Sequence, residues 1–173
     1  MRTAVGMLMA TVLLGPADAA LCSPRMPAAV AWRSPIEESI AARIAAVNRR
    51  APADEIARAV MESGRDYGID PLLILAVIEI ESRYNPSAIG ALKERGLMQI
   101  RRGTAKGLGL PWAAAFQVRA NIDAGSRYLA VHVEKYGDVY RAAARYNGGS
   151  REYARRVRMR YASIAVAVSG AML

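Results

Sequence analysis

Two glutamates, Glu79 and Glu81, lie near the end of the apolar run 71–84 and are candidates for acid chemistry. On a helical wheel that starts at Leu72, Glu81 falls at about 180°, in the middle of an apolar arc. Glu79 falls at about 340°, beside Arg83, and is predicted to lie on a solvated face. Because a carboxyl group among apolar side chains is costly to ionise, its pKa rises and it can hold a proton near neutral pH. Glu81 is therefore the candidate general acid, and a buried ion pair with an arginine is its alternative role.

Four short motifs mark the chain from Glu81 onward. They are Glu81-Ser82-Arg83-Tyr84-Asn85-Pro86; Gly96-Leu97-Met98-Gln99-Ile100 with Thr104-Ala105; Asn121-Ile122 with Gly125 and Tyr128-Leu129; and Tyr146-Asn147-Gly148-Gly149. Taken singly, the last motif is typical of an ordinary helix C-cap, since Gly and Asn suit a left-handed terminus. In their order and spacing, over about residues 72–157, the four motifs together resemble the lytic transglycosylase family of the goose-lysozyme-like type.

The resemblance implies an enzyme that cleaves the β-1,4 bond between N-acetylmuramic acid and N-acetylglucosamine in peptidoglycan. Glu81 matches the single catalytic acid and base of the family. The positions that match its supporting and substrate-binding residues are Ser82, Met98, Gln99, Tyr146 and Asn147. In the implied reaction the muramyl 6-hydroxyl closes on C1 and forms a 1,6-anhydro sugar. The nucleophile then belongs to the substrate, so no second carboxylate, metal or cofactor is implied.

The chain departs from the family pattern at Gly90, at Lys93-Glu94 and at Arg102. Glu94 matters most, because a carboxylate on the loop opposite the acid could act as base for a water molecule and make the enzyme a hydrolase. Its charged neighbours favour a solvated turn instead. A hydrolytic muramidase and a non-catalytic wall-binding assembly subunit are the alternative functions.

The N-terminal residues are typical of a secretory signal. Arg2 precedes an apolar stretch over 4–14, and Ala17-Asp18-Ala19 gives a cleavage pattern. We expect a signal peptide over 1–19 and a tether over 20–33, and hence an exported protein of the periplasm or cell envelope. Lipidation of the single cysteine, Cys22, is the minority interpretation, because the residue before it is leucine.

The charge of the chain predicts an anionic partner. The 173 residues include 53% hydrophobic residues and carry a formal net charge of +9, with seven arginines between Arg141 and Arg160. Such a surface could hold nucleic acid, but an exported protein meets the carboxylates of peptidoglycan first. The expected partners are therefore the glycan strands of peptidoglycan and, as a further expectation, a secretion or conjugation apparatus. The single cysteine and the single histidine, His132, exclude a Cys-rich or His-rich metal site.

Helical spacing and capping residues predict a mainly α, lysozyme-like (α+β) single domain over 34–164, followed by a short tail over 165–173. Ser34-Pro35 and Asp70-Pro71 are typical of helix starts. Helices are expected over about 35–50, 53–67, 71–84, 121–136, 138–146 and 151–164. The glycine-rich stretch 87–109 is expected to form a loop or small hairpin, with 97–100 as its one plausible strand. No segment of the mature chain is expected to span a membrane.

Overall fold

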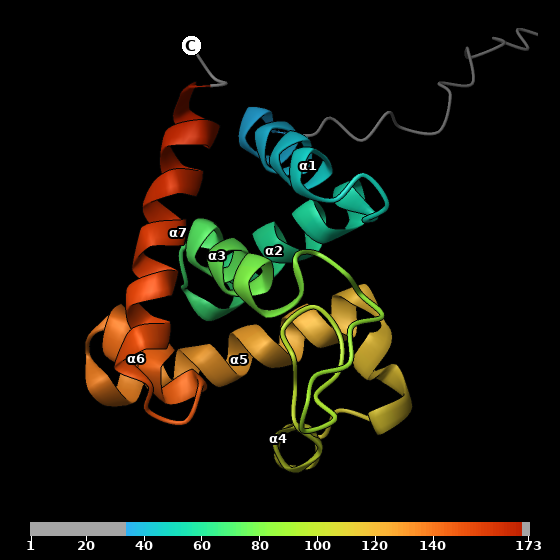
Figure 1. The fold of residues 1–173 in the computed structure, drawn as a ribbon, viewed down its shortest axis with the longest axis vertical. Coiled ribbons are helices and arrows are strands. Elements are labelled where there is room, and N and C mark those ends of the chain that lie inside the picture. Colours follow the sequence, from blue (N-terminus) through green and yellow to red (C-terminus); the bar gives the residue numbers. More distant parts are fainter. Residues whose placement is uncertain (1–33, 171–173) are drawn as a thin grey trace, which may run out of the picture. The chain divides into compact units, whose positions relative to one another are not determined.

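The computed structural model describes residues 34–170, and helices make up most of this part of the chain (Figure 1). The helices are α1 (Pro35–Val47), α2 (Ala53–Tyr67), α3 (Pro71–Ser82), α4 (Arg102–Leu108), α5 (Val118–Tyr136), α6 (Val139–Tyr146) and α7 (Arg151–Gly170), with a short 3-10 helix, η1 (Trp112–Phe116). The prediction of a mainly α domain is confirmed for this part. The predicted signal peptide and tether lie outside the described residues. No helix within 34–170 is long and apolar enough to cross a bilayer.

Side chains predicted from the sequence cap several of these helices. The Ser34 hydroxyl accepts a hydrogen bond from the Glu37 amide at 3.3 Å, at the start of α1. The Asp70 carboxylate accepts one from the Leu72 amide at 2.8 Å, at the start of α3. These bonds satisfy main-chain donors that a helix start leaves without partners. Helix α2 ends at Gly68, whose φ of 63° is a left-handed conformation that glycine adopts without strain.

Helix α3 lies at the centre of the core, with α7 and α2 packed against it (Figure 1). The seven consecutive residues from Leu73 to Glu79 are all buried, so this helix is covered on every side. It ends at Ser82 rather than at the predicted Tyr84. Arg83 and Tyr84 both have a positive φ, of 50° and 62°, and this turns the chain sharply into the next segment.

The prediction that Glu79 lies on a solvated face is wrong. Glu79 is only 6% exposed. Its Oε1 lies 2.9 Å from Nη2 of Arg43 on α1 and 2.8 Å from Nη1 of Arg160 on α7. The buried phenol of Tyr84 donates a further hydrogen bond to Oε2 at 2.7 Å. A helical wheel assumes that one side of the helix faces solvent. Here α1 and α7 each place an arginine against that side of α3. Glu79 therefore joins α1, α3 and α7 through a buried ion-pair network.

The segment between α3 and α4 is irregular, as the glycines predict, but it is shorter than expected. Isolated bridges pair Arg95 with Ile89 and with Ile100, and no continuous strand forms over 97–100. Residues 102–108, predicted as loop, form α4. Glycines at 103 and 107 obscured its helical pattern in the sequence, and Gly109 ends it with a φ of 72°.

The buried side chain of Asn121 links this irregular segment to α5 and η1. Its amide nitrogen donates to the carbonyl oxygens of Arg95 at 2.9 Å and Ala115 at 2.7 Å. Its amide oxygen accepts from the Met98 main-chain nitrogen at 2.7 Å. These bonds satisfy buried main-chain groups that a sheet would otherwise pair.

Helix α7 continues to Gly170, six residues beyond its expected end near Ile164. Ile164 and Val168 are both buried, and α7 also packs against α1 (Figure 1). The apolar side of this last stretch explains the extension, because tertiary packing stabilises a helix end that no capping residue announces.

Close packing between α5 and the irregular segment makes Gly125→Ala destabilising. A Cβ at this position would lie 2.8 Å from Cβ of Met98, whose side chain is fully buried. We expect the free energy of unfolding, measured by urea denaturation, to fall by about 1–3 kcal/mol. Gly107→Ala is the control, since a Cβ there meets nothing within 4 Å. It should leave stability unchanged or raise it; equal losses in the two variants would contradict the packing argument.

Candidate active site

Glu81 lies in the last turn of α3 and lines a cleft of about 380 Å³. The cleft lies between the irregular segment after α3 and the turn that follows α6, with contributions from α4 and α5. Its lining residues are Glu81, Gly90, Ala91, Glu94, Gln99, Ile100, Arg101, Thr104, Tyr128, Arg145, Tyr146, Asn147 and Gly148. Two polar walls thus face a carboxyl group that comes from the most apolar helix.

The environment of Glu81 favours its protonated form. Burial raises the pKa of this carboxyl above its ordinary value, and the negative charge of Glu94 raises it further. A hydrogen bond from the Tyr153 hydroxyl to Oε1, at 2.6 Å, opposes the shift, as do the positive charges of Arg156 and Arg101. Burial is the largest of these effects, so the side chain can hold a proton closer to neutral pH than an exposed glutamate.

Tyr153 was missed as a functional residue. The sequence predicts a buried stripe of Tyr153, Val157 and Tyr161 on the last helix, and the burial of the first two is confirmed. The spacing of the stripe indicates where the ring lies but not which partner its hydroxyl meets, which is 72 residues away in the chain. Burial and the nearby charge of Glu81 raise the pKa of the Tyr153 phenol, so it stays a neutral donor.

Tyr146 lines the cleft where the sequence places it, and it also supports the opposite wall. Its hydroxyl donates to the carbonyl oxygen of Met98 at 2.8 Å, and its ring lies 5.3 Å from that of Tyr128. The Met98 side chain itself does not line the cleft, because it is buried against Gly125. Met98 therefore contributes through its backbone rather than through its thioether.

The other predicted site residues also divide into those whose side chains line the cleft and those whose side chains do not. Gln99 and Asn147 both line the cleft, and the Gln99 amide is fixed by donating to the carbonyl oxygens of Gly96 at 2.8 Å and Ala88 at 3.2 Å. Ser82 is not among the lining residues, and its hydroxyl donates to the Ile78 carbonyl oxygen one helical turn back. The structure therefore brings Glu81, Gln99, Tyr146 and Asn147 together, and it leaves the side chains of Ser82 and Met98 outside the cleft.

Glu94 does not belong to a solvated turn, as its neighbours had suggested. Its side chain is only 14% exposed and lines the cleft that contains Glu81. Oε2 accepts a hydrogen bond from the Leu92 amide at 2.9 Å, and Oε1 lies 3.3 Å from Nε of Arg101. The backbone folds over the carboxylate here, which a count of neighbouring charges does not reveal.

His132 lies outside the cleft, half-buried on α5 between the rings of Tyr128 and Tyr136. Burial lowers its pKa, and the positive charges of Lys135 and Arg145 lower it further, so the imidazole is neutral near pH 7. Within the described part of the chain, no group of three or more His, Cys, Asp or Glu side chains is placed to hold a metal ion.

Comparison with known proteins gives matches to transglycosylases. The profile of the family described as "Transglycosylase SLT domain" matches residues 58–166. A "Transglycosylase" of Enterobacteria phage PRD1 is 36% identical over 86 residues, which cover 50% of this chain and 32% of the phage protein. "Membrane-bound lytic murein transglycosylase C" of Photorhabdus laumondii is 37% identical over 108 residues, 53% of this chain and 30% of the relative. The chain thus spans about a third of the length of these relatives.

Removing the Tyr153 hydroxyl should raise the pKa of Glu81. The hydrogen bond stabilises the carboxylate, so Tyr153→Phe favours the protonated form. Carbon-detected NMR titration of the Glu81 carboxyl measures the shift directly. Tyr161→Phe is the matched control on the same helix, because its hydroxyl donates to Asp70 at 2.6 Å instead. An unchanged or lower Glu81 pKa in Tyr153→Phe would contradict the assignment.

The raised pKa also makes Glu81 a pH-dependent source of instability. A carboxyl with a higher pKa in the folded state contributes stability below its unfolded pKa and loses it as the pH rises through the folded pKa. Glu81→Gln should therefore gain stability relative to the wild type as the pH rises above about 4.3, the ordinary pKa of a glutamate. Thermal unfolding at several pH values measures this difference.

Glu152→Gln should show the opposite trend and is the control for this pH series. A hydrogen bond from Arg155 lowers the pKa of Glu152, so its contribution is present above the unfolded pKa and is lost as the pH falls. Parallel pH trends in the two variants would refute the assigned environment of Glu81.

Proposed function

The chain belongs to the transglycosylase SLT domain family, and on this premise we propose that it is a lytic transglycosylase that cuts the glycan strands of peptidoglycan. The observation that carries the proposal is the position of Glu81. It is a mostly buried carboxyl with a raised pKa, at the edge of a polar cleft and held by one hydrogen bond. The printed names of the relatives, which include a lytic murein transglycosylase, support the same substrate.

In the proposed reaction, protonated Glu81 donates its proton to the glycosidic oxygen between N-acetylmuramic acid and N-acetylglucosamine. The bond from C1 to that oxygen breaks, and the carboxylate then takes the proton of the muramyl 6-hydroxyl as its oxygen closes on C1. The products are a free N-acetylglucosamine end and a 1,6-anhydromuramyl end. Glu81 ends the cycle protonated, and no water is consumed.

Tyr153 suits both halves of this cycle. Its hydrogen bond occupies Oε1 of Glu81, which leaves Oε2 for exchange of the proton with the sugar. The same bond stabilises the carboxylate after the first proton transfer, while burial destabilises it. The two opposing effects keep the proton transferable in either direction. In this scheme Tyr153 is a positioning residue, because it acts through Glu81.

The walls of the cleft supply polar groups for the sugar. In this proposal Gln99 and Asn147, which line the cleft, contact the hydroxyl and acetamido groups, and the Tyr146 ring contacts the sugar beside the carboxyl. The same Tyr146 hydroxyl fixes the Met98 carbonyl, so the two walls keep a defined separation. Ser82 and Met98 support the site without lining the cleft. Ser82 does so through its hydrogen bond within α3, and Met98 through its main-chain carbonyl.

A hydrolytic muramidase is the second candidate, because Glu94 lines the same cleft as Glu81. In that reaction the Glu94 carboxylate would activate a water molecule for attack at C1. Its oxygens are already engaged by the Leu92 amide and by Arg101, which favours a role in shaping the loop. The third candidate is a wall-binding assembly subunit that lacks turnover.

The cellular setting belongs to the proposal as well. The predicted signal over 1–19 supports export to the periplasm or cell envelope, where peptidoglycan lies. Small exported enzymes of this type open the wall locally, so we propose that the activity serves a secretion or conjugation apparatus. Only the resemblance to the family supports this setting.

Glu81→Gln should abolish release of soluble muropeptides from purified sacculi, with a loss of about a hundredfold or more. Mass spectrometry of the wild-type digest should show anhydromuramyl ends. Glu134→Gln, which changes an exposed glutamate of α5, is the control and should digest normally. Retained activity in Glu81→Gln would move the acid elsewhere.

The same digest separates the three candidates. Reducing ends that carry an added water, lost in Glu94→Gln, would identify the hydrolase. Binding to sacculi without release by the wild type would identify the non-catalytic subunit.

A further inference from the structure

A second hollow, of about 860 Å³, lies between α1, α3 and α7 and is larger than the catalytic cleft. Figure 1 shows α7 running beside both α1 and α3. Five arginines line this hollow, which we call the arginine groove: Arg43, Arg83, Arg155, Arg156 and Arg160. Only one carboxylate, that of Glu79, lines it with them.

The positive charge of the groove is only partly neutralised. Glu79 pairs with Arg43 and Arg160 together, so one negative charge faces two positive ones. Arg155 pairs with Glu152 on the exposed side of α7, at 2.7 Å. Within residues 34–170, no hydrogen bond or ion pair engages the guanidinium groups of Arg83 and Arg156. The groove therefore offers guanidinium donors for which the described residues supply too few acceptors.

Other residues hold the backbone of Arg83 and the side chain of Arg43 in place. The Arg83 backbone adopts a φ of 50°, and its carbonyl oxygen accepts a hydrogen bond from the Asn48 side chain at 3.1 Å. Arg43 binds Glu79 through both Nε and Nη2 and is only 20% exposed. A carboxylate entering the groove would meet a partly ordered set of donors, which reduces the entropy lost on binding.

The groove also has an apolar side that suits a short peptide. Met159 of α7 lines it and is 60% exposed, and Ile80 lines it from α3. Thioether and aliphatic groups beside guanidinium groups fit a ligand that alternates small apolar side chains with carboxylates. An extended anionic polymer such as nucleic acid would need a long basic surface rather than one local hollow.

The groove adjoins the catalytic carboxyl. Glu79 and Ile80 line the groove, and the next residue, Glu81, lines the cleft. Arg156 belongs to the groove, and its charge lowers the pKa of Glu81, so the two sites lie within electrostatic reach. Because both sites meet at the last turn of α3, a side group attached near a bond cut at Glu81 could reach the groove.

We propose that the arginine groove binds the carboxylate-bearing stem peptide of the muramyl residue whose glycosidic bond is cut. This inference rests on the proposed function and names the part of the substrate that it leaves open. The guanidinium group of Arg83, which has no acceptor among the described residues, contacts the stem carboxylates, and Arg155 joins it by exchanging Glu152 for the ligand. Ile80 and Met159 contact the alanine methyl groups of the stem. The groove thereby selects glycan that still carries its peptides.

The test compares two substrates made from the same sacculi, namely strands with intact stem peptides and strands from which an amidase has removed them. Arg83→Gln and Arg155→Gln should each lose about tenfold in kcat/KM on stem-bearing strands, through KM, and should cut bare strands at the wild-type rate. Arg156 is not used, because its charge acts on Glu81.

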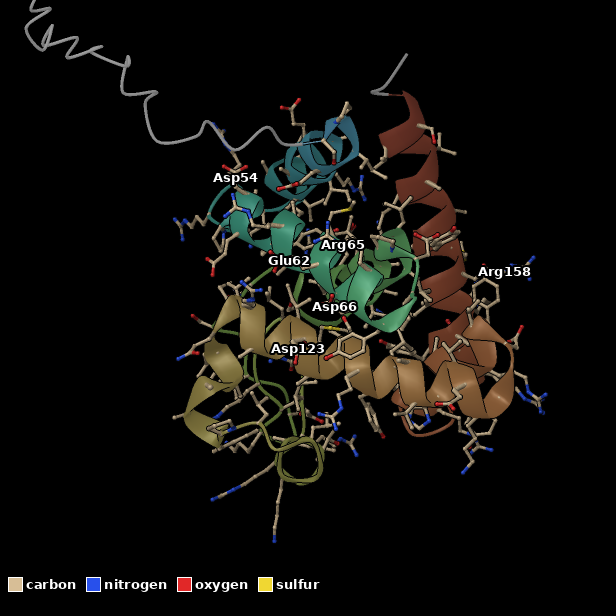
Figure 2. The ribbon with its side chains drawn as sticks, turned by 180° about the vertical axis from the view of Figure 1, so that it is seen from behind. Asp54, Glu62, Arg65, Asp66, Asp123 and Arg158 are labelled. Carbon is tan, nitrogen blue, oxygen red and sulfur yellow. The ribbon has the colours of Figure 1, made fainter. Side chains whose placement is uncertain are left out.

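Arg158→Gln is the matched control. It removes the same charge from the same helix, but Arg158 points away from the groove and lies over the Tyr140 ring at 5.6 Å (Figure 2). It should behave as wild type on both substrates. Thermal unfolding of each variant shows whether it is folded. The wild type supplies a second measurement, because its KM should rise with salt more steeply for stem-bearing strands than for bare ones.

The results keep the two proposals apart. Wild-type enzyme that cuts neither substrate would overturn the proposed function. Wild-type enzyme that cuts both, with variants that lose activity equally on both or on neither, would overturn the stem-peptide site alone. Loss of binding to anionic phospholipid vesicles in Arg83→Gln and Arg155→Gln, without any change on stem-bearing strands, would assign the groove to a membrane surface instead.

Discussion

The hydrogen bond between Tyr153 and Glu81 joins the central helix to the last one at the point where chemistry is proposed. Its strength as a constraint comes from its surroundings, since both side chains are mostly buried and neither has bulk water to replace its partner. Burial alone would make Glu81 a poor proton donor, because it raises the pKa of the carboxyl. The hydrogen bond from the phenol fixes the position of the carboxyl and partly offsets the rise in its pKa. The packing of α7 on α3 therefore affects the acidity of Glu81 as well as the stability of the fold.

Two glutamates on one helix, two residues apart, end in different environments for reasons that lie outside the helix. Glu79 meets arginines from α1 and α7 and serves as the buried counter-charge of three elements. Glu81 meets a phenol and a cleft. The difference depends on what the neighbouring helices present at each level of α3 rather than on the periodicity of α3 itself.

Local chemistry predicts much of this protein, and long-range contacts account for what it misses. The helix starts at Ser34 and Asp70, the core side of α3 and the candidate acid Glu81 all follow from short-range patterns. The environment of Glu79 and the hydroxyl partner of Tyr153 depend on residues 36 and 72 positions away, which a window of one helix cannot contain. Helix α4 was not predicted, because its glycines obscure the helical pattern. The burial of Glu94 depends on a backbone turn in which the Leu92 amide bonds to its carboxylate.

The three hydrogen bonds of the Asn121 amide have a consequence for the rigidity of the cleft. Because one buried side chain bonds the main chain at Arg95, Met98 and Ala115, its loss would remove a hydrogen bond from all three groups. The turn between α6 and α7 contains Gly148 and Gly149. Among the described residues, no buried side-chain amide bonds to the backbone of these two glycines. The wall of the cleft next to α5 is therefore tied across the fold by a buried side chain, whereas the turn between α6 and α7 is held by local main-chain bonds to Ala144 and Arg145.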